Sequence, residues 1–371
     1  MPPVPQVNVR ANTVPLVVTN QCTETIYPGL ATQAGTSPGT NGFGLAPGAT
    51  RNLTVGHDWQ GRVWGRTNCS FNSAGTGPSN TGGNNGGGAA CTTGDCFGVV
   101  DCKVAGAPPA TLAEFTLATS SGQTFYDISL VDGYNIPIGI VSLYPESGNS
   151  KLTDIPPNLT NPICIGTAAL LAADDSTSDD TYLGTNSSFP IPLEKSLSYN
   201  DVSRWCPWDL QSDPPTKPGD GVYPYPDDTI TRPLFDPCYS ACAKNARDSD
   251  CCIGKYNSPS ACKPSGYSKM AKKVCPDAYS YAFDDQTSTF IVPSGGGFEV
   301  VFCPTGRSSN ILATMGPELR QLAATGAVSA QMLADTQNIT LIRSRNAGIT
   351  LRSANRLAVL LVATFLTLLA A

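Results

Sequence analysis

A twelve-residue segment with three cysteines constrains the fold of this chain more than any other part of the sequence. The segment reads Cys91-Thr92-Thr93-Gly94-Asp95-Cys96-Phe97-Gly98-Val99-Val100-Asp101-Cys102. Its short spacers, its Thr-Gly-Asp turn and the glycine after the second cysteine predict a tight loop that a disulfide can close. Such a disulfide would form in an oxidising compartment.

The composition of the whole chain agrees with this interpretation. It contains 14 cysteines, 36 glycines and 31 prolines in 371 residues, and only 14% of the residues are charged. This indicates a secreted, loop-rich protein whose cysteines pair with one another. Zinc binding is the competing explanation, but His57 is the single histidine and no Cys-x-x-Cys pair is repeated. We therefore expect neither a metal nor a cofactor.

Charge and hydrophobic pattern narrow the fold class and the partners. The net charge of −6 and the absence of a basic run argue against a nucleic-acid partner. Short runs of β-branched and aromatic residues, separated by Gly, Pro, Asn and Asp, predict an all-β sandwich that we expect to be a monomer. These runs cover residues 14–19, 60–66, 111–118, 125–131 and 298–302, and helix is expected only locally, at 238–247, 267–275 and 317–335.

Further segments, in a consistent order, resemble the thaumatin-like family of secreted plant proteins, which has relatives in fungi and animals. Gly61-Arg62-Val63-Trp64-Gly65-Arg66-Thr67-Asn68-Cys69 is almost identical to a family segment, and segments 16–22, 108–115, 125–137, 251–252, 275–285 and 301–304 also match. The resemblance implies a thaumatin-like domain over residues 13–306. Its fold would be an antiparallel β-sandwich with smaller disulfide-rich domains and an acidic cleft between them.

The family resemblance also implies how the cysteines pair. The implied disulfides are Cys22-Cys303, Cys69-Cys91, Cys96-Cys102, Cys164-Cys275, Cys206-Cys238, Cys242-Cys251 and Cys252-Cys262. The family pattern contains one further pair. One of its positions is Val292 here, and the partner near Cys164 is absent as well, so no free thiol is expected.

The resemblance implies a ligand site of one arginine and four carboxylates. Mapped by motif, the ligand-binding residues are Arg62, Glu114, Asp127, Asp132 and Asp284. We expect this cleft to bind β-1,3-glucan, a cell-wall polysaccharide. An endo-β-1,3-glucanase is the alternative, with Glu114 as acid and Asp127 or Asp132 as base or nucleophile. An antifungal defence protein is a third possibility.

Several structural explanations for the same residues stay open at this point. Asp132 precedes Gly133 and fits a turn, Asp284 fits a loop cap, and Glu114 with Arg62 fits a structural ion pair. Nearby aromatic residues, Tyr126, Tyr134 and Phe283, are expected to offer stacking faces to a sugar. Two long insertions, 165–205 and 207–237, flank the cleft; they either reshape it or are surface loops.

Both ends of the chain carry expectations about targeting. Residues 357–371 form an uncharged apolar tail, shorter than the roughly 20 residues of a membrane-spanning helix. Small residues at 346–348 and a polar spacer precede it, which is typical of a GPI-attachment signal over 347–371 with the lipid on Asn346. A tail-anchor helix or an ordinary apolar terminus is the alternative. Residues 307–346, rich in Ser, Ala and Gln, then predict a stalk.

The secretory route accounts for the remaining expectations. Residues 1–12 contain no recognisable signal peptide, and we interpret them as the remnant of a leader that is missing or replaced. N-glycosylation sequons occur at Asn52, Asn158, Asn186 and Asn338, with a fifth at Asn68 whose middle residue is a cysteine. We expect a secreted glycoprotein that is held at the cell surface or wall by its GPI anchor.

Overall fold

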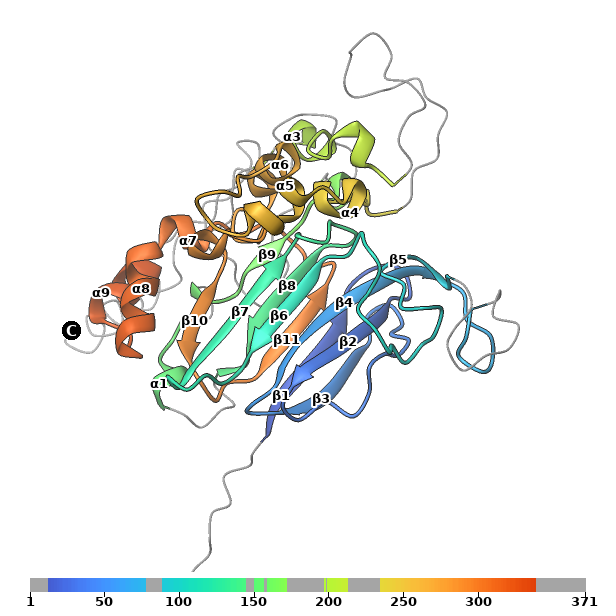
Figure 1. Ribbon diagram of the computed structural model, residues 1–371. Coiled ribbons are helices and arrows are strands. Elements are labelled where there is room, and N and C mark those ends of the chain that lie inside the picture. Colours follow the sequence, from blue (N-terminus) through green and yellow to red (C-terminus); the bar gives the residue numbers. More distant parts are fainter. Residues whose placement is uncertain are drawn as a thin grey trace, which may run out of the picture.

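Two β-sheets pack face to face in the computed structural model, which describes residues 13–77, 89–144, 150–156, 159–171, 197, 199–212 and 234–337 (Figure 1). One sheet has the order β3 (Thr50–Gly56), β1 (Thr13–Asn20), β11 (Phe298–Phe302), β8 (Ile138–Ser142) and β9 (Ile163–Cys164). The other has the order β10 (Phe290–Pro293), β7 (Gln123–Ser129), β6 (Leu112–Thr116), β4 (Gln60–Cys69) and β2 (Tyr27–Ala34), and β5 (Cys91–Thr93) pairs with β4. All neighbouring strands are antiparallel except β1 and β11, which run parallel. The expected antiparallel sandwich therefore holds apart from this pair.

The space between the sheets is filled by alternate residues of the strands. Phe115, Tyr126 and Phe298 meet at its centre, with ring centroids 4.7 Å apart for Tyr126 and Phe298 and 5.3 Å apart for Phe115 and Phe298. Because side chains alternate between the two faces of a strand, the residues next to Phe115 on β6 and Tyr126 on β7 point to the outer face of the second sheet. That outer face carries the candidate site.

Seven disulfides include every cysteine of the chain. The pairs are Cys22-Cys303, Cys69-Cys91, Cys96-Cys102, Cys164-Cys275, Cys206-Cys238, Cys242-Cys251 and Cys252-Cys262, the pairing that the family resemblance implied. The loop closed by Cys96-Cys102 packs on the outer face of β4. The buried guanidinium of Arg66 holds it there by donating to the carbonyls of Val99 and Val100 at 2.6 and 2.7 Å. Burial lowers the pKa of Arg66 to about 10.

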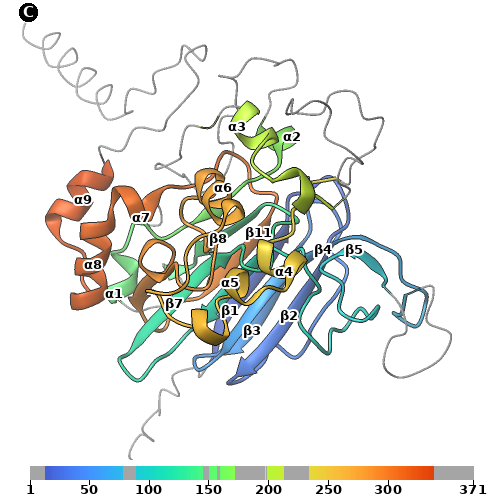
Figure 2. The ribbon, with the colours of Figure 1, turned by 45° about the horizontal axis from the view of Figure 1, so that its top comes forward.

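Short helices gather at one end of the sandwich, as Figures 1 and 2 show. They include α3 (Tyr199–Ser203), α4 (Ala241–Asn245), α5 (Asp248–Cys251) and α6 (Gly266–Val274), and three disulfides lie in this region. Ser265 caps α6 by accepting a hydrogen bond from the Ser268 amide, and the helix buries Tyr267, Ala271 and Val274. The described residues also contain single helical turns: α1 (Ser150–Thr153), α2 (Ala168–Leu171), and the 3-10 segments at Trp208–Leu210, Gly254–Tyr256 and Asp285–Thr287.

The expected stalk is wrong for residues 311–337. These residues form α7 (Ile311–Thr314), α8 (Gly316–Thr325) and α9 (Ala330–Gln337), and α8 lies beside β10 at the edge of the second sheet (Figure 1). Leu319, Leu322 and Met332 are buried in the main core. The Asp277 carboxylate accepts hydrogen bonds from the first amides of α7, at 2.8 and 2.9 Å. A Ser/Ala/Gln-rich sequence therefore folds onto the domain because its few apolar residues recur on one helical face.

Several expectations fall on residues outside the described part of the chain. They are the leader remnant 1–12, the GPI signal 347–371, the lipid site Asn346, the sequons at Asn158, Asn186 and Asn338, and most of the two insertions. Within the described ranges no helix is both long enough and apolar enough to cross a bilayer. Of the described sequons, Asn52 is exposed on β3, the edge strand of the first sheet.

Candidate functional site

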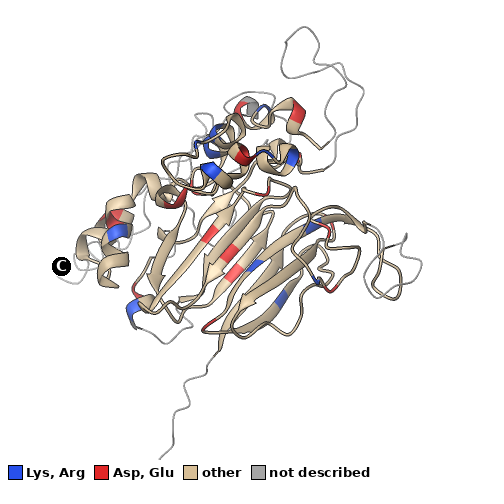
Figure 3. Cartoon of the chain, in the orientation of Figure 1, with Lys and Arg blue, Asp and Glu red and all other residues tan. Residues whose placement is uncertain are grey.

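Three charged side chains form a row across the outer face of the second sheet. Arg62 on β4 is the cross-strand partner of Glu114 on β6, and Glu114 is the partner of Asp127 on β7. Figure 3 shows the acidic positions on neighbouring strands with a basic one beside them. Directly opposite residues of an antiparallel pair have Cβ atoms about 4.5–5.5 Å apart, so the strand register brings these groups together.

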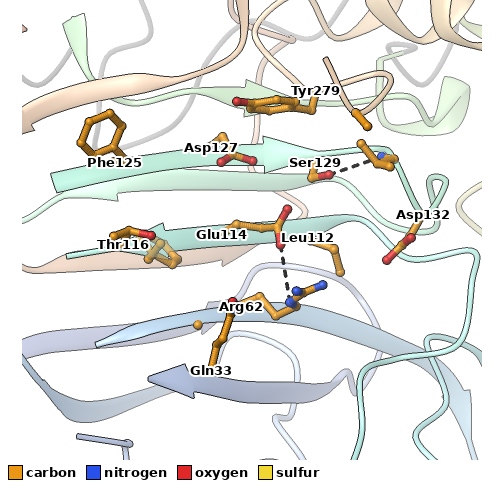
Figure 4. A pocket seen from close by; sticks show the side chains of 14 residues that line it. Gln33, Arg62, Leu112, Glu114, Thr116, Phe125, Asp127, Ser129, Asp132 and Tyr279 are labelled. Atoms are coloured by element: carbon orange, nitrogen blue, oxygen red, sulfur yellow. Dashed lines mark hydrogen bonds and ion pairs between the residues drawn. The ribbon is translucent and has the colours of Figure 1, made fainter. Parts of the chain in front are cut away.

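The row forms the floor of a pocket of about 430 Å³ (Figure 4). Gly61 lies next to Arg62 and also lines the pocket; the position needs glycine, because a Cβ there would come within 2.4 Å of the Ala31 carbonyl oxygen and of the buried Trp59 ring. Residues that line the pocket are Gln33, Gly61, Arg62, Leu112, Glu114, Phe115, Thr116, Phe125, Asp127, Ser129, Val131, Asp132, Tyr279 and Ala282. Of the five ligand residues expected from the sequence, four are therefore in one pocket.

Glu114 is held by the only cation among the lining residues. Its Oε1 lies 3.5 Å from Arg62 Nε, and about a third of each side chain is exposed. Burial raises the pKa of Glu114, the Arg62 charge opposes that shift, and Asp132 adds to it; the Ser129 hydroxyl lowers the same pKa by hydrogen bonding. Glu114 therefore has two groups that stabilise its ionised form.

The ionised form of Asp127 is stabilised less than that of Glu114. Its Oδ1 is buried and has no hydrogen-bond partner. Burial raises the pKa of Asp127 well above its usual value, and the neighbouring Glu114 and Asp285 charges raise it further, against a weaker lowering by Arg62. An Asp in these surroundings binds a proton more readily than an ordinary surface carboxylate does.

Asp132 lies at one end of the pocket, in the turn that follows β7 (Figure 4). The next residue, Gly133, has φ of 102°, so the turn needs glycine there. Burial raises the pKa of Asp132, and Arg62 opposes the shift. Asp132 is thus a turn residue and a pocket residue at once.

Asp284, the fifth residue expected to bind ligand, is not among the residues that line this pocket. Its carboxylate accepts hydrogen bonds from the Ser280 amide and hydroxyl at 3.1 and 2.9 Å and from the Thr287 hydroxyl at 2.6 Å. Lys272 Nζ lies 3.2 Å away and also contacts the carbonyls of Ala278 and Thr287. Asp284 therefore caps the loop that carries one pocket wall, the structural alternative noted above.

The expected aromatic faces also need correction. Tyr126 and Tyr134 are fully buried in the core, and Phe283 does not line the pocket. Phe125 and Tyr279 line it instead. Strand alternation contained this signal: if Asp127 points outward on β7, then Phe125 does so too and Tyr126 points inward.

Gln33 and Tyr279 are among the lining residues that were not identified from the sequence. Gln33 has no partner in the β2–β4 ladder, because the register passes from Thr32 opposite Gly61 to Ala34 opposite Gln60. A β-bulge of this kind has no clear sequence signature. Tyr279 is fixed beside β7 by backbone hydrogen bonds to Ile128 and Leu130, and its hydroxyl contacts Asp285 at 2.8 Å and Thr289 at 2.5 Å.

Comparison with known proteins gives consistent matches over most of the chain. A model described as "Thaumatin family" matches residues 20–304. "Pathogenesis-related protein 5" of Arabidopsis thaliana is 34% identical over 285 residues, which cover 77% of this chain and 88% of that protein. "Thaumatin-like protein 1" of Pyrus pyrifolia is 35% identical over 292 residues, 77% of this chain and 89% of that protein. Among solved structures, a thaumatin-like xylanase inhibitor is 32% identical over 35% of this chain and 78% of its own, with a TM-score of 0.28.

Proposed function

The chain belongs to the thaumatin family, and on that premise we propose that its pocket binds β-1,3-glucan of a cell wall. The observation that carries the proposal is the row of Arg62, Glu114 and Asp127 across one sheet face, flanked by the rings of Phe125 and Tyr279. Thaumatin-like proteins are secreted, and seven disulfides fit an extracellular protein.

The chemistry of the pocket suits a sugar chain. A pyranose ring has hydroxyl groups at its rim and C–H groups on its faces, so polar groups can bind its rim while an aromatic ring packs against a face. The pocket offers both, and its volume of about 430 Å³ lies within the range of small-molecule sites in proteins. Charge-assisted hydrogen bonds are the stronger kind, so Arg62 and Glu114 would contribute most to orientation.

We further propose that the protein acts at the cell surface. The apolar tail at 357–371 and the small residues at 346–348 support GPI attachment at Asn346. The exposed Asn52 supports N-glycosylation during secretion. A protein held at the membrane would meet the glucan of its own wall first.

An endo-β-1,3-glucanase is the alternative, and one observation favours it. Glu114 and Asp127 are direct cross-strand partners. Retaining glycosidases use two carboxyl groups that lie close together, and cross-strand partners on one sheet face bring two such side chains side by side. Asp127 would then protonate the leaving oxygen while Glu114 attacks the anomeric carbon, the reverse of the roles expected from the sequence. Water would next displace Glu114 and return a proton to Asp127.

Laminarin separates these functions in one experiment. Retention of the purified protein on laminarin, with loss of retention in Glu114→Gln, would support binding. New reducing ends from the unmodified protein but not from Glu114→Gln would support hydrolysis. Glu318→Gln on α8, outside the pocket, is the matched control and should behave as the unmodified protein. No retention and no reducing ends in any of the three proteins would refute both functions.

A further inference from the structure

We propose that Asp127 holds a proton when the pocket binds its ligand, so that Asp127 donates a hydrogen bond to a sugar hydroxyl while Glu114 accepts one. This inference rests on the proposed sugar-binding function and adds a specific division of roles within the pocket. It assigns the acidic role to the residue that the sequence had favoured as base or nucleophile.

The first step is that the two carboxyl groups should not both be ionised. Glu114 and Asp127 are direct cross-strand partners on β6 and β7, and like charges in that position repel each other. Among the residues that line the pocket, Arg62 is the single cation. One guanidinium balances one carboxylate, so a proton on the other removes the repulsion.

Asp127 binds this proton more favourably than Glu114 does. Glu114 has Arg62 at 3.5 Å and the Ser129 hydroxyl, both of which stabilise its anion. Asp127 has a buried oxygen without a donor. A protonated carboxyl avoids leaving that oxygen both charged and unpaired.

The groups that face Asp127 from the neighbouring loop strengthen this assignment. Asp285 adds a second negative charge and raises the pKa of Asp127 further. The Tyr279 hydroxyl donates a hydrogen bond to Asp285 and contacts the Thr289 hydroxyl. Arg62 acts in the opposite direction, but it lies one strand further away, beyond Glu114. The geometry and the surrounding charges therefore both favour a proton on Asp127.

The consequence for the ligand is an alternating order of donors and acceptors across the strands. Arg62 donates, Glu114 accepts and Asp127 donates. Two neighbouring hydroxyls of a neutral sugar fit this order, because each can donate to Glu114 and accept from the group beside it.

The matched variants Asp127→Asn and Glu114→Gln test this assignment with laminarin oligosaccharides at pH 6. An amide is a neutral donor like a protonated acid, so Asp127→Asn should keep the affinity within about threefold. Glu114→Gln should weaken it by about tenfold or more, the size of a lost charge-assisted hydrogen bond. Because Asp127→Asn creates an Asn-Ile-Ser sequon, all proteins should come from a host without N-glycosylation. The reverse order of the two variants would overturn the proposal.

A second readout does not depend on the sugar. A carboxyl whose pKa is raised on folding destabilises the protein increasingly as pH rises from its unfolded value towards its folded value. The melting temperature of Asp127→Asn, relative to the unmodified protein, should therefore rise between pH 4 and pH 8. A pH-independent difference would overturn the proton on Asp127 whether or not laminarin binds. A rising difference without any sugar binding would refute the proposed function and leave the proton assignment in place.

Discussion

Replacing Leu322 with alanine tests whether the C-terminal helices belong to the folded domain. Leu322 on α8 has no exposed surface and lies in the same core cluster as Phe290 and Val292 of β10. The next residue, Ala323, accepts a hydrogen bond from the Gln123 side chain on β7 at 2.8 Å. Truncation of a buried leucine loses its transfer free energy and leaves a cavity, so we expect the free energy of unfolding to fall by about 2–5 kcal/mol.

The matched control is Leu333→Ala on α9, where 40% of the side chain is exposed. It removes the same atoms from the neighbouring helix but should cost less than about 1 kcal/mol. Thermal unfolding with the disulfides intact measures both. A cost of 1 kcal/mol lowers the melting temperature by about 2–4 °C in domains of 150–250 residues, so Leu322→Ala should melt at least about 4 °C below the unmodified protein. Equal melting temperatures for the two variants would refute the packing argument and return the helices to a detached stalk.

Three further outcomes follow from the described residues. Lys272→Met should destabilise the protein by about 1–3 kcal/mol, because the mostly buried Asp284 loses its ion pair. Urea titration measures the free energy of unfolding, and an unchanged value would mean that the loop does not depend on this ion pair. Glycopeptide mass spectrometry of the secreted protein should find a glycan on Asn52, which is exposed, but none on Asn68. The Asn68 side-chain amide already donates to Thr92 next to the Cys69–Cys91 disulfide, and a glycan on Asn68 alone would contradict the prediction. Phe97→Gly should leave the free energy of unfolding unchanged or raise it by up to about 1 kcal/mol in the same urea titration. Phe97 is 58% exposed, and its φ of 60° is a conformation that glycine adopts more easily. A clear loss of stability would show that the Phe97 ring makes a stabilising contact.

Much of the fold follows from local sequence signals. The β-rich runs became strands because their alternation gives each one an apolar face, which only a second sheet can cover. The helix expected at 267–275 forms as Gly266–Val274, since Ser265 is a good cap and the apolar residues follow helical spacing. The parallel pairing of β1 with β11 was not predictable in this way. It joins the two ends of the domain, and no turn connects them to fix the register.

The candidate site was predictable where strand register positions it and not where loops do. Arg62, Glu114 and Asp127 are brought together by the ladder itself. Asp284 and Asp285 are adjacent in sequence, and only the fold of the loop decides which carboxylate contacts a pocket residue. The Asp284 carboxylate accepts hydrogen bonds from Ser280 and Thr287 and pairs with Lys272. The Asp285 carboxylate accepts a hydrogen bond from the pocket residue Tyr279.

The strands that carry the pocket floor and the bulge and loop that carry its ends should affect ligand preference differently. The floor of the pocket lies on three hydrogen-bonded strands above a packed aromatic core, so its charged groups have little freedom to move. Its two ends are built differently: Gln33 comes from a bulge on the edge strand β2, and Tyr279 from a loop that Lys272 and Asp284 hold in place. A substitution at either end changes what the pocket contacts without disturbing the Arg62–Glu114–Asp127 row. Gln33→Ala and Tyr279→Ala should therefore alter which oligosaccharides bind, whereas loss of the Arg62–Glu114 ion pair should weaken the binding of all of them.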